Sequence, residues 1–315
     1  MQFITSLLNS MPGAAAQGLV WGITALGVYI TYRILDVADL TVDGSLCTGG
    51  AVCVIMTVNG APMWAALLCA FIAGLLAGLV TGLLHTSCGI PAILSGILTQ
   101  LALYSVNLHI MGYGTDSGAK ANLPVSVDKY DLLVSARYVR DLRIGNPIFV
   151  LLLFIAVIIA AMYWFFGTEL GCSLRATGSN QNMARAQGIN TKLATVLGLM
   201  LSNGLVALSG AMLAQYQGFS DINMGRGAIV IGLAAVIIGE VIFSNASINF
   251  AVKLSSCVLG AIIYYVVIQF VLKLGLSTDD LKLLTALVVA VFLGVPYWKN
   301  QYLSKRVRKG ASADA

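Results

Sequence analysis

The chain has 315 residues, of which 58% are hydrophobic and only 10% charged, and its formal net charge is +5. Soluble globular domains carry roughly 25% charged residues, so this composition excludes a water-soluble protein. No polar stretch approaches the size of an independent soluble domain, about 100 residues. We therefore expect a single membrane domain over residues 1–298, followed by a basic tail over 299–315.

Apolar segments recur along almost the whole chain. A helix needs about 20 apolar residues to cross the hydrocarbon core of a bilayer. Nine segments are candidates: 14–34, 45–58, 63–84, 90–111, 147–166, 193–214, 228–243, 250–272 and 281–298. The sequence predicts an all-α fold, a polytopic bundle of transmembrane helices.

Two of these segments, 45–58 and 228–243, are too short to cross a bilayer, and each follows a polar stretch that contains glycine. The first is second among the leading four segments, and the other is second among the closing four. The single helix 147–166 between the two groups inverts one relative to the other. Paired short helices in two inverted halves are typical of a transport pathway, and the alternative is two ordinary short helices.

Small residues follow one face of the third segment. Ala66, Ala70, Gly74, Gly78 and Gly82 fall at every fourth position, so a neighbouring backbone can approach closely there. This pattern favours tight packing inside one subunit over a seam between two copies.

The loop 167–192 is the most distinctive polar stretch. It combines small residues with Arg175 and Arg185, which suits a short helix docked on another protein. We expect Gly178 and Gly188 to frame this helix and Asn180 to serve as its N-cap. If the basic tail (Lys305, Arg306, Arg308 and Lys309) is cytoplasmic, nine crossings place this loop in the cytoplasm too.

The segment 112–146 then lies on the extracytoplasmic side. Its second part, KYDLLVSARYVRDLRIG, interleaves apolar and charged residues. This pattern fits a surface element with a docking partner as well as it fits a solvated loop. The docking candidates are Lys129, Asp131, Arg137, Arg140, Asp141 and Arg143.

Motifs for catalysis are missing from the sequence. It has no Gly-x-x-x-x-Gly-Lys-Ser/Thr loop for ATP, no Gly-x-Ser-x-Gly elbow, no His-Glu-x-x-His and no Cys-x-x-Cys pair. We therefore expect no catalytic residue, no metal and no cofactor bound by this chain. The basic tail suits anionic lipid better than nucleic acid.

Polar residues inside membrane helices are costly and are candidates for function. They can line a conduit for a polar solute, or they can hydrogen-bond neighbouring helices to one another. The pore-lining candidates are Ser95, Thr99, Gln100, Tyr104, Asn107, Ser202, Asn203, Tyr265 and Gln269. The acids Asp36, Asp39, Asp43 and Glu240 are expected near the interface rather than at mid-depth.

The run from Leu170 to Ile238 resembles the permeases of ABC importers in the branched-chain amino acid and ribose family. That family has a Gly-x-x-x-Arg-Ala motif, then Asn, Ala and Gly-Ile-Asn. The matching residues are Gly171, Arg175, Ala176, Asn180, Ala184, Gly188, Ile189 and Asn190. The earlier run RILDVADLTVDGSLCTGGAV looks like that of permeases paired with tryptophan- or tyrosine-type binding proteins. One departure is Glu240, because many relatives carry Gly-Gly where this chain has Gly239-Glu240.

The resemblance implies a permease of the bacterial inner membrane that forms a pore with a second copy or a sister permease. Cytoplasmic ATPase subunits, which would bind ATP and Mg, would grip residues 171–190, including Arg185. An extracytoplasmic binding protein would deliver a small organic solute, with an amino acid, possibly aromatic, favoured. The alternatives are a sugar or nucleoside permease of the same family, a self-sufficient secondary carrier or channel, and a structural scaffold.

Overall fold

Helices make up most of the chain in the computed structural model, which describes residues 2–114, 118–126, 129–130, 132–139, 146–243 and 249–273 and a few positions between 283 and 294. The first half contains α1 (Gln2–Tyr29), the π-helical turn η1 (Ile30–Ile34), α2 (Val42–Val58), α3 (Met63–Thr86) and α4 (Ala92–Met111). After β1 (Asn122–Pro124) and η2 (Ala136–Tyr138) come α5 (Pro147–Gly167), α6 (Glu169–Ser179) and α7 (Gln181–Ala186). The second half contains α8 (Thr191–Gln217), β2 (Phe219–Asp221), α9 (Ala228–Ile242) and α10 (Phe250–Lys273).

Six of the described helices are long and apolar enough to cross a membrane: Ser10–Ile34, Met63–Thr86, Ala92–Met111, Pro147–Gly167, Thr191–Gln217 and Phe250–Lys273. The apolar helices α2 and α9 are shorter, as the sequence predicts. The expected segment 281–298 lies largely outside the described residues. A polytopic helical bundle is therefore confirmed, whereas the expected total of nine spans is not.

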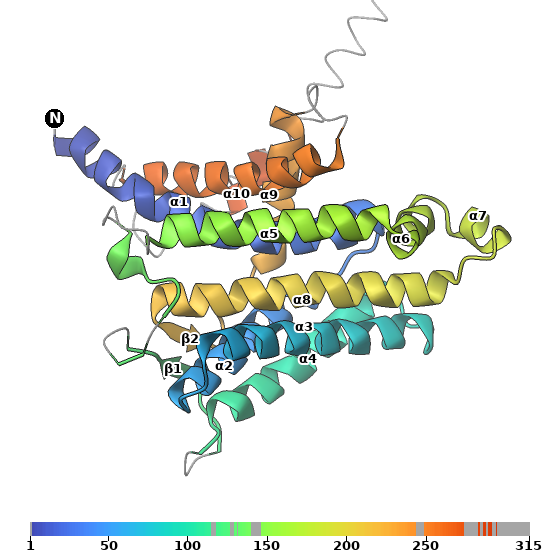
Figure 1. The fold of residues 1–315 in the computed structure, drawn as a ribbon, viewed down its shortest axis with the longest axis horizontal. Coiled ribbons are helices and arrows are strands. Elements are labelled where there is room, and N and C mark those ends of the chain that lie inside the picture. The colour runs from blue at the N-terminus through green and yellow to red at the C-terminus, as the bar shows by residue number, and fades with distance from the viewer. Residues whose placement is uncertain are drawn as a thin grey trace, which may run out of the picture.

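The long helices pack in a reciprocal pattern (Figure 1). Helix α8 packs along α2 and α3, helix α1 packs along α9 and α10, and α1 and α8 also contact each other. The first helix of each half thus lies on the second and third helices of the other half. We call α8 with α2 and α3 the α8 unit, and α1 with α9 and α10 the α1 unit.

Glycines bring the helices of the α8 unit into backbone contact. A Cβ atom at Gly74 or Gly78 would meet the carbonyl oxygen of Asn203 or Leu199 on α8. A Cβ atom at Gly49 of α2 would meet the carbonyl oxygen of Ala207. The small face of α3 therefore packs inside the chain, which confirms that prediction.

Large apolar side chains remain exposed on the outer faces of α3, α4 and α5. Trp64 on α3 is 63% exposed, Leu101 on α4 is 65% exposed and Trp164 on α5 is 73% exposed. In an aqueous protein such faces would be sites of aggregation or association, whereas on a membrane-spanning bundle they are suited to contact lipid tails.

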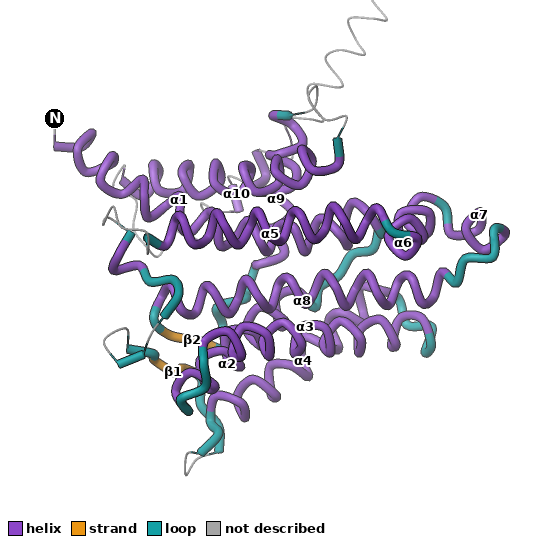
Figure 2. The backbone as a smooth tube through the Cα atoms, in the orientation of Figure 1, coloured by secondary structure: helices purple, strands orange, loops and turns teal. Residues whose placement is uncertain are grey.

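A small sheet joins the two halves at one end of the bundle, where Figure 2 shows both strands. Strand β1 pairs antiparallel with β2, with Asn122 opposite Asp221 and Pro124 opposite Phe219. Sequence reasoning did not anticipate this sheet, because each strand is only three residues long and its partner is distant in the chain. Helices α6 and α7 lie at the opposite end of the bundle (Figure 1).

Candidate functional site

Helix α6 packs between the end of α5 and the turn η1. Thr168 is its N-cap and accepts a hydrogen bond from the backbone N–H of Gly171 at 3.4 Å. A Cβ atom at Gly171 would meet the Phe165 carbonyl oxygen, and one at Gly178 would meet that of Ile34. Gly178 therefore lies inside α6 at a close contact and does not frame the next helix, contrary to the expectation.

Arg175 connects α6 to α10. Its guanidinium carbon lies 4.3 Å from the centroid of the Phe250 ring and 5.6 Å from that of Phe166. A cation over an aromatic face is attracted by the quadrupole of the ring, and guanidinium groups are especially suited to such stacking. This contact fixes α6 to the first turn of α10.

Helix α7 is short but held at both ends. The Asn180 side-chain oxygen accepts hydrogen bonds from the backbone N–H groups of Asn182 and Met183, both at 3.0 Å. At the other end Gly188 has a φ of +81°, and the N–H of Ile189 donates to the Ala184 carbonyl at 3.0 Å. The N-cap role of Asn180 and the terminating role of Gly188 are confirmed.

The polar face of α7 is open to the surroundings. Ala184 is buried, whereas Met183 is 61% exposed and Arg185 and its neighbours on the same helix are also exposed. The Arg185 Nε donates to the Thr191 hydroxyl at 2.8 Å, and Asn190 caps α8 by accepting from the N–H of Leu193. A short, capped helix that is exposed at every position except Ala184 thus protrudes from the end of the bundle (Figure 1).

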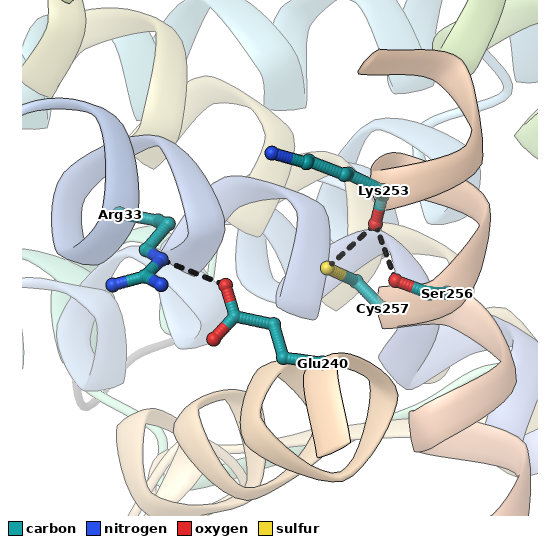
Figure 3. Close-up of polar contacts among 5 residues, drawn as sticks. All are labelled: Arg33, Glu240, Lys253, Ser256 and Cys257. Carbon is teal, nitrogen blue, oxygen red and sulfur yellow. Dashed lines mark hydrogen bonds and ion pairs between the residues drawn. The ribbon is translucent and has the colours of Figure 1, made fainter. Parts of the chain in front are cut away.

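An ion pair lies between η1 and the last turns of α9. The Nε of Arg33 is 2.7 Å from a carboxylate oxygen of Glu240, and the two side chains are 58% and 33% exposed. Figure 3 shows this pair beside the first turns of α10, where Ser256 and Cys257 donate to the Lys253 carbonyl. Glu240 is therefore the carboxylate that links η1, at the end of the first long helix, to α9.

A buried polar network crosses the α8 unit. One Asp39 carboxylate oxygen accepts from the Asn203 side-chain amide at 2.7 Å, and the Asn203 carbonyl accepts from the Ser45 hydroxyl at 2.6 Å. Asp39 is only 2% exposed, and Asn203 lies near the middle of α8. The expectation that Asp39 lies near the interface is therefore wrong, because the Asn203 amide of α8 and the backbone N–H of Thr41 satisfy the carboxylate at this depth.

Three threonines continue this polar layer towards α4. The hydroxyls of Thr41 and Thr81 are 2.7 Å apart, and Thr81 donates to Thr99 at 3.0 Å. Bonds of this kind connect helices whose side chains would otherwise be unpaired in an apolar environment.

The other pore-lining candidates divide into buried and more exposed residues. Asn107 donates to the Gly44 carbonyl at 3.5 Å, Ser202 donates to that of Gly27 at 2.8 Å, and Ser95 donates within its own helix. The remaining four candidates are Gln100 and Gln269, which are half-buried, Tyr104, which is 44% exposed, and Tyr265, whose ring stacks on Trp21 at 6.0 Å. Apart from Ser95, the buried candidates hydrogen-bond neighbouring helices to one another, and the role of all the candidates in lining a pore stays a prediction.

The docking candidates are only partly described. Lys129 and Arg137 are exposed, and Lys129 lies over the Tyr130 ring at 5.5 Å from its centroid. Tyr130 in turn donates to the Val58 carbonyl at the end of α2, at 3.4 Å. Asp131, Arg140, Asp141 and Arg143 lie outside the described residues. No cluster of three metal-ligating side chains occurs in the part of the chain that the structure describes.

Sequence reasoning missed a short repeat in the segments that lead into the two short helices. Asp39 accepts from the N–H of Thr41 at 2.9 Å, and Asp221 accepts from the N–H of Asn223 at 2.7 Å. The runs Asp39-Leu-Thr-Val and Asp221-Ile-Asn-Met contain the signal. An aspartate that binds the N–H two residues on favours a turn before a helix.

Comparisons with known proteins identify the family of this chain. The family model described as "Branched-chain amino acid transport system / permease component" matches residues 10–296. A tyrosine transport system permease protein of Clostridioides difficile is 41% identical over 91% of this chain and 91% of its own length. An uncharacterized protein of Rickettsia prowazekii is 36% identical over 91% of this chain and 97% of its own length, and a fructose import permease of Bifidobacterium longum is 24% identical over 86% and 73%. The chain therefore belongs to the family of branched-chain amino acid transport system permease components.

Proposed function

We propose that this chain is the membrane-spanning subunit of an ATP-driven importer for an aromatic amino acid such as tyrosine. It acts in a bacterial inner membrane and forms its pore with a second copy or a sister permease. Cytoplasmic ATPase subunits hold ATP and Mg and press on α6 and α7, while an extracytoplasmic binding protein delivers the solute to the opposite end. The chain itself performs no catalysis.

The single observation that carries this proposal is the construction of α7. Its two ends are capped, which stabilises the helix, and Ala184 packs against the bundle. The other residues of α7 are exposed and can contact a partner. A partner protein can move the transmembrane helices of a permease only through an element that keeps its shape under load. Such an element passes its displacement on to the helices that it contacts. Helix α6 connects α7 to α5, η1, α8 and α10.

The solute class rests on the relatives. The relative at 41% identity is named for tyrosine transport, whereas the fructose permease shares only 24% identity. An amino acid is therefore favoured over a sugar.

The reciprocal packing supports a pathway between two inverted halves. Each half places its first helix on the short second helix of the other half, and each short helix follows an aspartate turn. Interrupted helices at corresponding places of two inverted halves mark the transport path in other membrane transporters.

The test is uptake into vesicles that contain the permease, its ATPase subunits and its binding protein. We expect ATP-dependent accumulation of radiolabelled tyrosine, with fructose and leucine as comparison solutes. Gly188→Val places a β-branched residue at a φ of +81°. This substitution costs roughly 1–2 kcal/mol locally and distorts the end of α7. Tyrosine uptake should then be lost while ATP hydrolysis continues.

The matched control is Gly60→Val. Gly60 has a φ of +82° and, like Gly188, has open space around its missing Cβ, but it lies between α2 and α3, at the end of the bundle away from α7. Normal uptake by Gly188→Val would refute the coupling role of α7. Gradient-driven uptake without ATPase subunits would instead identify a secondary carrier, and preferential uptake of fructose would identify a sugar permease.

A further inference from the structure

The first turn of α9 is capped by a side chain from the other half of the chain. Asp43, in the first turn of α2, accepts from the backbone N–H of Gly227 with one carboxylate oxygen and from that of Ile229 with the other, both at 3.0 Å. The first N–H groups of a helix have no partner within the helix, and a carboxylate there also interacts favourably with the helix dipole. Asp43 therefore satisfies two donors at the start of this short helix.

Cys47, one turn further along α2, holds the loop that leads into α9. Its sulfur accepts from the N–H of Gly225 at 3.1 Å and donates to the Ile222 carbonyl at 3.3 Å. A Cβ atom at Gly225 would meet the Asp43 carbonyl oxygen, so the close approach of this loop to α2 depends on glycine. Four hydrogen bonds thus tie two turns of α2 to residues 222–229.

The same part of α2 is also fixed to α8. The Ser45 hydroxyl donates to Asn203, and the Cβ of any other residue at Gly210 would meet the Leu46 carbonyl oxygen. The start of α9 is therefore positioned through α2, although α9 otherwise packs on α1 and α10.

We propose that Asp43 is a positioning residue. Its two hydrogen bonds to the N–H groups of Gly227 and Ile229, which we call the clasp, hold the start of α9 against α2, so that the two short helices move as one body during transport. This inference rests on the proposed function. The clasp connects the α8 unit to the α1 unit, so a displacement applied to either unit reaches both short helices together.

The first experiment measures the clasp without any transport. Purified protein is treated with a maleimide, and the modification rate of each cysteine is followed by peptide mass spectrometry. Cys47, Cys53 and Cys257 are all buried, whereas Cys88 and Cys172 are exposed and calibrate the reagent. Asp43→Ala should raise the rate at Cys47 at least about tenfold, because it removes two hydrogen bonds to a charged acceptor. The rates at Cys53 and Cys257 should not change.

Asp43→Asn is the conservative variant. Its amide can accept from one N–H but presents a donor to the other, so the rate at Cys47 should rise by a smaller factor than in Asp43→Ala. Asp36→Asn is the matched control, because Asp36 is exposed in the preceding loop and has a φ of +54°, which asparagine tolerates. An unchanged rate at Cys47 in Asp43→Ala, or an equal rise at all three buried cysteines, would overturn a local clasp.

The second experiment measures uptake at varied solute concentration in vesicles that contain the full transporter. In this proposal Asp43 does not contact the solute. Asp43→Asn should therefore lower the maximal rate of uptake several-fold and leave the KM for solute within about twofold of wild type, as expected when solute binding is unchanged. A raised KM with an unchanged maximal rate would show that Asp43 acts on the solute, and would reject positioning. If no variant or wild-type protein transports with ATP, the proposed function fails, whereas the cysteine rates still decide the clasp.

Discussion

The α8 unit and the α1 unit have the same order of packed helices but are held together by different side chains. Both rely on glycine: Gly49, Gly74 and Gly78 meet backbone atoms in the α8 unit, and Gly239 and Gly260 do so in the α1 unit. The α8 unit adds the buried network of Asp39, Asn203 and Ser45.

The α1 unit instead contains aromatic contacts and an ion pair at its surface. Trp21 stacks on Tyr265, Tyr29 lies 6.3 Å from Phe250, and Arg33 pairs with Glu240. Hydrogen bonds demand fixed geometry, whereas stacking and an exposed ion pair tolerate displacement. We therefore expect the α8 unit to resist displacement more strongly than the α1 unit.

The largest expected effect comes from the backbone contacts that both units share. Gly49→Ala would force α2 away from the Ala207 backbone, and we expect a loss of about 3 kcal/mol in the free energy of unfolding. Thermal and denaturant unfolding in detergent measures it. Gly13→Ala is the control, because the nearest atom to its added Cβ is the Tyr216 hydroxyl at 3.9 Å. Equal stability of the two variants would contradict the close approach.

The buried network should give the next largest effect. Asn203→Leu leaves the Asp39 carboxylate and the Ser45 hydroxyl without this partner, and we expect a loss of about 2 kcal/mol. Ser202→Ala removes one hydrogen bond at the adjacent position of α8 and should cost about 1 kcal/mol. If Ser202→Ala proves the more damaging variant, the network is not what makes the α8 unit firm.

The corresponding substitution in the α1 unit should be milder. The indole N–H of Trp21 is buried and has no hydrogen-bond partner in the described chain. Trp21→Phe keeps an aromatic ring against Tyr265 and removes that unpaired donor, so we expect a change below about 1 kcal/mol. The same unfolding measurement applies, and a loss as large as that of Asn203→Leu would remove the distinction between the units.

The exposed ion pair should give the smallest effect. Arg33→Gln removes a contact between two partly exposed side chains, which is worth about 0–1 kcal/mol. The difference from wild type should shrink further between about 0.05 M and about 0.5 M salt, because mobile ions screen exposed charges. A difference that is large and independent of salt would show that Glu240 is effectively buried in the membrane.

Features that depend on near neighbours in the chain were predictable. The helices could be predicted from the length of the apolar segments, and the small face of α3 from small residues at every fourth position. The ends of α7 could be predicted from Asn180 and Gly188, because their hydrogen-bond partners are near neighbours in the chain. The placement of Gly178 and Asp39 was not predictable in this way. Gly178 abuts Ile34, and Asp39 bonds to Asn203, which is 164 residues further along the chain.

The sequence by itself determined that this protein is a bundle of membrane helices with two short members and a short, capped helix after the fifth long segment. Periodicity and capping are local properties, so they can be read from neighbouring residues. Only the tertiary structure decided which half each helix packs on, and that Asp43 caps α9 across a separation of 184 residues. Such a pairing leaves no local pattern, because the unpaired N–H groups of α9 accept a carboxylate from whichever segment the fold brings beside them.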